Sequence, residues 1–293
     1  MRRWIPAELK EASPFLLPLL GFLAAFVLVP VLGAVVDSVF RDVTFLEPGF
    51  AGLGNYAWLL HNPAFRQSAG FTLLFVLVSV PLEMLLGLAF ALVLNERLPL
   101  RGFLRACVLI PWVVPAAVSA RIWELIYNYS FGLANFLWMA TGIPAEPVNW
   151  LGTGAGAFFA LVLADAWKTT PFVAVILLTG LSAIPEDLYL QAQVDGAGLF
   201  TRFTKITVPL LKPALVVALI FRTIDSLRVF DLIYVLTGGG PGGSTTSLSL
   251  HGYRYFLLGD FGYGSAVSVV LFLVALCLSL ATMKAGGFER VIR

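Results

Sequence analysis

Six long apolar runs dominate the chain and restrict its fold more than any other feature of the sequence. They cover approximately residues 14–39, 70–95, 103–127, 154–183, 213–236 and 263–284. Each run is continuous over roughly 20 residues or more, which is the length that a transmembrane helix needs. Strands of a transmembrane barrel would instead alternate apolar and polar residues. We therefore predict an all-α polytopic membrane protein with six transmembrane helices, in which residues 1–293 form a single transmembrane domain.

The distribution of Lys and Arg predicts how these spans are oriented. If the N-terminus is cytoplasmic, twelve of the 19 basic residues fall on the inner side and three fall in outer loops. The inner ones are Arg2, Arg3, Lys10, Arg97, Arg101, Arg105, Arg202, Lys205, Lys212, Lys284, Arg290 and Arg293, and the outer ones are Arg41, Arg66 and Arg254. Because basic residues concentrate in cytoplasmic loops, both termini are predicted to be cytoplasmic. The sequence thus indicates a multi-pass protein of the cytoplasmic (inner) membrane.

A polar segment separates the fourth and fifth runs, and it forms most of a predicted cytoplasmic loop over residues 184–212. Pro185 suits the first position of a helix, and Glu186 and Asp187 suit its first turn. Gly196 can end the helix just past its last turn. Leu190 and Val194 lie four residues apart, as do Leu188 and Ala192, so a helix here would offer an apolar strip to a groove. The alternative is an interfacial helix that lies on the lipid surface.

Residues 189–213 resemble the "EAA" loop of binding-protein-dependent ABC importer permeases. Asp195, Gly196 and Ala197 match its central D-G-A, and residues 206–213 (ITVPLLKP) resemble the segment that follows. The resemblance implies a type I importer fold in which this loop is the coupling helix for an ATPase subunit. It assigns that contact to Glu186, Asp187, Leu190, Ala192, Asp195, Gly196 and Ala197. Leu190 stands where the family usually has Glu, so the acidic contact to the ATPase is expected either to be absent or to be supplied by Glu186 or Asp187.

Other motifs resemble the carbohydrate branch of that family. They are residues 52–56 (GLGNY), 62–65 (NPAF), 110–111 (IP) and 236–241 (LTGGGP), with 167–172 (WKTTPF) and 221–231 (FRTIDSLRVFD) closest to trehalose/maltose-type permeases. The resemblance implies one half of a permease heterodimer that imports a disaccharide such as trehalose or maltose. Two ABC ATPase subunits would bind ATP and Mg, so this chain itself would need no cofactor. An extracytoplasmic solute-binding protein would dock on outer loops, including 48–68 and 238–262.

Nine ionisable residues fall well inside the predicted spans, and none of them is expected to face lipid because of the cost. They are Glu83, Arg121, Glu124, Asp165, Lys168, Arg222, Asp225, Arg228 and Asp231. The pairs Arg121/Glu124 and Asp165/Lys168 and the series 222–225–228–231 are spaced at i,i+3, within pairing reach on one helix. Two interpretations stay open: the pairs fix helix packing, or they form a polar lining for a hydroxyl-rich solute.

The polar-lining interpretation names candidate solute contacts on two spans. Trp167, Lys168, Thr169, Thr170 and Phe172 surround Pro171, which is expected to kink the fourth span. They combine the hydrogen-bonding groups and aromatic faces that a sugar needs. On the fifth span, the resemblance to the maltose branch assigns Asp225, Ser226 and Val229 to solute binding.

Three other functions are compatible with a polytopic membrane protein. An importer for another small polar solute would share all these features. An ion-coupled secondary transporter could use Asp165, Asp225 or Asp231, but it does not explain the cytoplasmic helix. A membrane-embedded enzyme is not indicated, because the sequence has no nucleophile–base constellation, and His61 and His251 stand apart in outer loops and are not expected to form a metal site.

The glycine-rich residues 238–244 lack the lysine of a phosphate-binding loop, so a flexible hinge or docking loop is expected there. No catalytic residue and no nucleic-acid partner are predicted.

Overall fold

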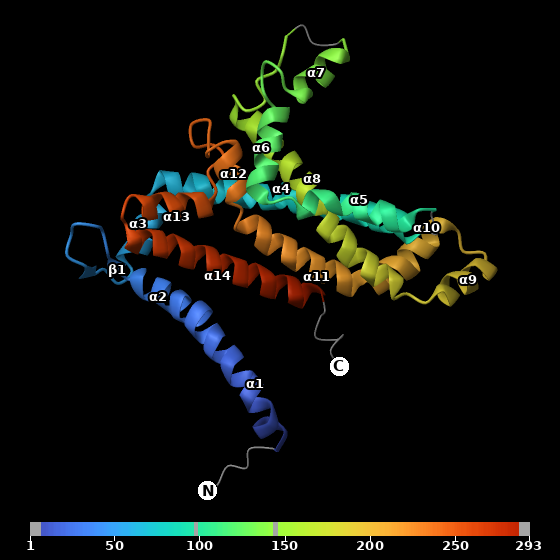
Figure 1. The fold of residues 1–293 in the computed structure, drawn as a ribbon, viewed down its shortest axis with the longest axis horizontal. Helices are drawn as coiled ribbons and strands as arrows, with labels where there is room; N and C mark the ends of the chain where they lie inside the picture. Colours follow the sequence, from blue (N-terminus) through green and yellow to red (C-terminus); the bar gives the residue numbers. More distant parts are fainter. Residues whose placement is uncertain (1–6, 97–98, 143–145, 287–293) are drawn as a thin grey trace. The chain divides into compact units, whose positions relative to one another are not determined.

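A computed structural model describes residues 7–96, 99–142 and 146–286, and these are mostly helical (Figure 1). The chain divides into two compact units. Unit 1 comprises Met1–His61 and Gly252–Val270, and unit 2 comprises Asn62–His251 and Leu271–Arg293. The prediction of a single domain stays a prediction. Arg2, Arg3, Arg97, Arg290 and Arg293, which contribute to the predicted orientation, lie outside the described residues.

Unit 1 contains the first apolar span. It consists of α1 (Ala7–Leu23), a π-helical turn (Ala24–Leu28) and α2 (Val29–Asp37). A short hairpin follows, in which β1 (Phe40–Arg41) pairs antiparallel with β2 (Gly49–Phe50), and then α3 (Gly54–His61). The side chain of Asn55 donates to the carbonyls of Ser38 and Phe40 at 2.9 and 2.8 Å and fixes the start of α3 to the hairpin.

Three long helices form the core of unit 2: α4 (Pro63–Asn95), α8 (Gly154–Ser182) and α11 (Val208–Leu227). They lie side by side in Figure 1. Small residues permit this close packing, as is usual between transmembrane helices. A Cβ atom on Gly87 of α4 would lie 2.5 Å from Val173 of α8, and one on Gly180 of α8 would lie 2.6 Å from Ala214 of α11.

Shorter helices surround this core. They are α5 (Arg101–Val113), α6 (Ala116–Ile126), α7 (Leu133–Ala140), α9 (Glu186–Val194), α10 (Leu199–Arg202) and α12 (Asp231–Leu236), with a π-helical turn at Phe203–Thr207. Two further helices, α13 (Leu248–Leu257) and α14 (Phe261–Gly286), contribute residues to both units. Among the described residues, five helices are long and apolar enough to span a membrane, and the bent pair α5–α6 makes a sixth if it counts as one span. The predicted helical membrane fold is therefore confirmed.

The predicted continuous span 103–127 is wrong, because α5 and α6 meet at a bend of 92°. Val114 and Pro115 are both extended, with ψ of 129° and 143°. A proline ring disfavours the helical conformation of the residue before it, which explains why α5 ends at Val113. Apolar side chains continue across the break, so the hydropathy of the sequence does not reveal it.

The predicted fifth span and the loop before it are also shifted. Helical structure begins at Leu199 instead of residue 213 and ends at Leu227 instead of 236. Lys205 and Lys212 lower the hydropathy of this stretch but do not interrupt the helix. The loop predicted at 184–212 is consequently confined to α9 and the turns on either side of it.

Two further predictions concern a proline and a glycine-rich loop. The helix α8 continues through the buried Pro171 without a break, and the kink expected there stays a prediction. The loop 238–244 is closed by buried threonines, since Thr245 Oγ1 donates to the carbonyl of Gly240 at 2.6 Å and Thr246 Oγ1 to that of Gly239 at 3.2 Å. These bonds close the loop on itself, and its role as a hinge or docking loop stays a prediction.

Candidate functional site

One buried guanidinium group joins the three core helices of unit 2. Arg222 on α11 is 1% exposed. Its Nε donates to Glu83 on α4 at 2.5 Å, Nη2 to Asp165 on α8 at 3.1 Å, and Nη1 to Asp225 at 2.6 Å. Ser226 Oγ accepts a further bond from Nη2 at 2.8 Å. Because charge pairing and hydrogen bonding together compensate for removing an ion from water, this arrangement makes a buried arginine tolerable.

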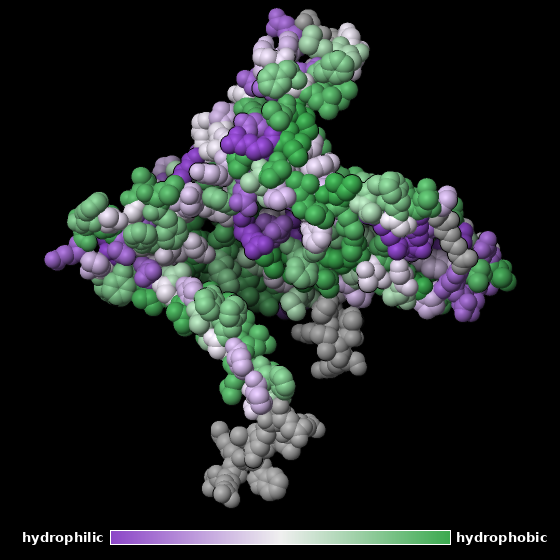
Figure 2. All heavy atoms as spheres, viewed as in Figure 1, coloured by the Kyte–Doolittle hydropathy of each residue, from purple (hydrophilic) through white to green (hydrophobic). Residues whose placement is uncertain are grey.

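The charge cluster extends from the core to the surface. Asp225 bridges Arg222 and Arg228, and the second contact measures 3.3 Å. The side chains of Asp225 and Arg228 are 50% and 70% exposed. Figure 2 shows a hydrophilic patch where this end of α11 meets α6, within a mostly hydrophobic surface. The predicted series is thus correct for its first three members, whereas Asp231 lies beyond the helix end, in the first turn of α12.

Lys168 does not form the predicted pair with Asp165. Its Nζ donates instead to the carbonyls of Val114 at 2.5 Å and Trp112 at 3.4 Å. These carbonyls lie at the C-terminal end of α5, where the break leaves backbone acceptors without helical partners. A cation at the end of a helix also interacts favourably with its dipole. Lys168 therefore caps α5 at the bend.

Aromatic rings lie beside these charges. Trp112 stacks on Phe172 with ring centres 5.7 Å apart, and Phe172 meets the edge of Phe221 at 6.0 Å. Trp112 and Phe221 are about half exposed. Phe221 and Asp225 are four residues apart on α11, as are Lys168 and Phe172 on α8, so each pair shares a helix face. We call Trp112, Lys168, Phe172, Phe221 and Asp225 the polar–aromatic face.

The structure divides the predicted solute contacts into two groups. Trp167, Lys168, Phe172, Asp225 and Val229 are at least partly accessible. The other three are buried: Thr169 donates to the carbonyl of Asp165, Ser226 bonds to Arg222, and Thr170 is 2% exposed. These three face the interior of the unit, and their assignment as solute contacts stays a prediction.

Sequence reasoning missed Trp112, Phe221 and the charged pair of Glu83 with Arg222. A usable signal existed for Trp112, which lies between Pro111 and Pro115 in a run that would otherwise read as uniform helix. No local signal connects Glu83 with Arg222, because 139 residues separate them.

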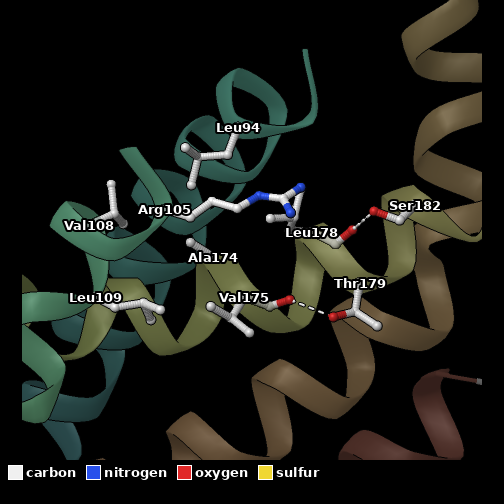
Figure 3. Close-up of a pocket in the computed structure, with 9 residues that line it drawn as sticks. All are labelled: Leu94, Arg105, Val108, Leu109, Ala174, Val175, Leu178, Thr179 and Ser182. Atoms are coloured by element: carbon white, nitrogen blue, oxygen red, sulfur yellow. Dashed lines mark hydrogen bonds between the residues drawn. The ribbon is translucent and has the colours of Figure 1, made fainter. Parts of the chain in front are cut away.

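A separate pocket of about 360 Å³ lies between α4, α5 and α8 (Figure 3). It is lined by Leu94, Arg105, Val108, Leu109, Ala174, Val175, Leu178, Thr179 and Ser182. Figure 3 shows the Arg105 guanidinium extending across it, while the hydroxyls of Thr179 and Ser182 donate to backbone carbonyls at 2.9 and 2.8 Å. With few polar groups left for a ligand, this pocket is a poorer match for a sugar than the polar–aromatic face.

The predicted polar helix forms as α9 and ends as the sequence indicates. Gly196 has φ of +77°, a conformation that glycine adopts at little cost. The N–H of Gly196 bonds to the carbonyl of Gln193 at 3.1 Å, and that of Ala197 to Ala192 at 2.8 Å. These two bonds make the Schellman arrangement that commonly ends a helix.

The surface of α9 is accessible, and one side chain ties the helix to α11. Leu190 and Val194 are 53% and 89% exposed, and Glu186, Asp187, Asp195 and Gly196 are exposed as well. Ala192 and Ala197 are half-buried. The hydroxyl of Tyr189 shares a 3.0 Å hydrogen bond with that of the buried Thr207, directly before α11. The predicted coupling residues therefore lie together on α9 and the turn after it, and the Tyr189–Thr207 hydrogen bond connects α9 to the start of α11.

Known proteins resemble this chain over almost all of its length. The trehalose/maltose transport system permease protein MalF of Thermococcus litoralis is 56% identical over 284 residues, which cover 97% of this chain and 96% of that protein. The trehalose transport system permease protein SugA of Mycobacterium tuberculosis is 40% identical over 243 residues, with 82% and 76% covered. The crystal structure of a bacterial ABC transporter involved in the import of alginate has the same fold, with a TM-score of 0.83 over 98% of each chain and 23% identity.

Residues 83–285 also match the family described as binding-protein-dependent transport system inner membrane component. That region contains α9, the buried charge cluster and the polar–aromatic face. The chain thus belongs to the binding-protein-dependent inner membrane components, the permease subunits of ABC importers.

Proposed function

We propose that this chain is one permease half of an ATP-driven importer for a disaccharide such as trehalose or maltose. The observation that carries the proposal is the polar–aromatic face, which combines ring surfaces with charged groups beside the middle of α8. A sugar needs both, since its apolar faces pack on aromatic rings and its hydroxyls take up hydrogen bonds. The similarity to a trehalose/maltose permease over nearly the full length supports the same solute class.

The coupling step is proposed to use α9. With both termini cytoplasmic, α9 lies on the cytoplasmic side, where its exposed Leu190 and Val194 can enter a groove on an ATPase subunit. Two such ATPases would bind ATP and Mg. Their closure would move α9 and, through the Tyr189–Thr207 contact, α11. The spans would then alternate between inward- and outward-facing states around a site near the middle of the membrane.

The remaining partners follow from the same assignment. A second permease subunit would complete the passage, and an extracytoplasmic solute-binding protein would deliver the sugar to outer loops that include 48–68 and 238–262. An importer for a different small polar solute is the competing proposal. An ion-coupled carrier is disfavoured, because Asp165 and Asp225 are both bonded to the fixed cation of Arg222.

The test is ATP hydrolysis by the complex of this chain with its neighbouring permease, ATPase and binding protein in liposomes. Trehalose and maltose are compared with an amino acid as control. We expect one disaccharide to stimulate hydrolysis, and Asp225→Asn to reduce that stimulation more than it reduces assembly. Assembly without a response to either sugar would reject the solute class, and failure to assemble with an ATPase would reject the importer.

A further inference from the structure

Two hydrogen bonds to α8 fix the position of α6 along the axis of that helix. At the start of α6, Lys168 of α8 bonds to the carbonyl of Val114 at 2.5 Å. At its end, the hydroxyl of Tyr127 donates to the carbonyl of Ala160 at 3.2 Å. Ala160 and Lys168 lie about 12 Å apart along α8, and Ala160 is about 9 Å inside the end of that helix. The helix α6 therefore lies alongside the first half of α8, a helix long and apolar enough to span the membrane.

One side of α6 is packed and the opposite side is open. Ser119 and Ala120 are fully buried against the rest of unit 2. Val118, Ile122 and Leu125 are 50%, 39% and 60% exposed. Their spacing of four and three residues places them on one helix face. An apolar strip with this spacing is suited to pack against another helix.

The same face carries an exposed ion pair. Arg121 Nη1 lies 2.5 Å from Glu124 Oε2, and the two side chains are 67% and 42% exposed. In Figure 2 a hydrophilic patch interrupts the hydrophobic surface over α6. Charged side chains inside the membrane rarely face lipid and usually face other helices or a water-filled cavity. This face of α6 is therefore expected to contact another helix or water in addition to lipid.

We infer that the face of α6 formed by Val118, Arg121, Ile122 and Leu125 is a contact surface for the second permease subunit. The inference rests on the proposed function, which requires such a subunit. Helices of the partner would cover the apolar strip, while the Arg121–Glu124 pair would lie where the contact meets the aqueous passage between the subunits. Lys168 bonds to the backbone at the break, where α6 turns by 92° from α5. The chain by itself therefore sets the orientation of this face, without the partner.

Site-specific photo-crosslinking in the assembled transporter tests this inference. A benzoylphenylalanine residue replaces Leu125 in one variant and Leu77 in a control, since Leu77 is an equally apolar, 71% exposed residue on α4. The complex is first checked for bound ATPase and for sugar-stimulated hydrolysis. We expect ultraviolet light to join the Leu125 variant to the second permease, with less of this adduct from Leu77.

The alternative outcomes overturn the inference. A Leu125 adduct with lipid only, with the ATPase, with the binding protein or with another copy of this chain would reject α6 as the heterodimer contact. If the complex is active, such a result leaves the proposed function intact. If no second permease co-purifies and no sugar response is seen, the proposed function and this inference fail together.

A second measurement avoids reliance on the photoreactive group. Leu125→Glu should lower the amount of second permease that co-purifies by about tenfold, because it places an unpaired charge in an apolar contact. Leu125→Met keeps the size and polarity and should leave co-purification unchanged. Equal recovery with both variants would contradict the inference.

Discussion

The Arg222 guanidinium on α11 donates to the Glu83 carboxylate on α4 at 2.5 Å, and both side chains are buried. This bond, with that to Asp165 on α8, places a charged junction inside a core that is otherwise apolar. Removing one member of a buried ion pair costs more than the pair contributes, because it leaves the other charge unpaired.

Arg222→Met should therefore lower the free energy of unfolding by about 3–5 kcal/mol. The readout is the midpoint of thermal unfolding of the purified protein in detergent. Arg228→Met is the matched control, since Arg228 is mostly exposed and surface pairs contribute little. Similar midpoints for the two variants would show that the buried junction is not a determinant of stability.

Lys168→Met should loosen the bend between α5 and α6. The substitution leaves the carbonyls of Trp112 and Val114 without their donor. Spin labels on exposed positions of α5 and α6, such as Phe103 and Leu125, should then show a broader distance distribution. Lys168→Arg retains a cation and donors and should resemble the original protein. An unchanged distribution in Lys168→Met would mean that packing alone sets the bend.

Gly196→Ala should weaken coupling while leaving membrane insertion intact. A side chain strains the backbone at φ of +77°, at a cost of about 1 kcal/mol. We expect less sugar-stimulated ATP hydrolysis in the reconstituted complex. Gly198→Ala is the control, because Gly198 has φ of −69° and open space around its Cβ position. Normal stimulation in Gly196→Ala would argue against a coupling role for this turn.

Tyr189→Phe should reduce stimulated hydrolysis by removing the 3.0 Å bond to Thr207. Thr207→Val removes the same bond from the other side. If the bond transmits movement from α9 to α11, the double variant should be no worse than either single variant. Additive losses would show that the two hydroxyls act independently.

Local signals in the sequence correctly predicted α9 and its end. Pro185 precedes the first turn and Gly196 supplies the left-handed residue, so neighbouring residues alone determine this helix. The pair Arg121–Glu124 was predicted for the same reason, since both residues lie on one exposed face.

Features that residues on other helices determine were predicted less well. The i,i+3 spacing of Asp165 and Lys168 permits a pair, but Arg222 binds the carboxylate and free carbonyls bind the ammonium. The i,i+3 spacing shows which side chains of one helix can reach each other, but it does not show whether groups on other helices bind them instead. Pro115 is a local signal for the break at Val114, but the apolar run continues across both residues and by itself predicts an unbroken span.

The unbroken course of α8 has a mechanical consequence. Ser182, next to α9, and Lys168, at the polar–aromatic face, belong to one helix and lie about 21 Å apart along its axis. A rigid rod turns a small tilt into a displacement that grows with distance from the pivot. A tilt of about 10° around the level of Lys168 would move Ser182 sideways by about 3.6 Å, given that rise per residue. As one helix, α8 can therefore carry movement between the end next to α9 and the level of the polar–aromatic face.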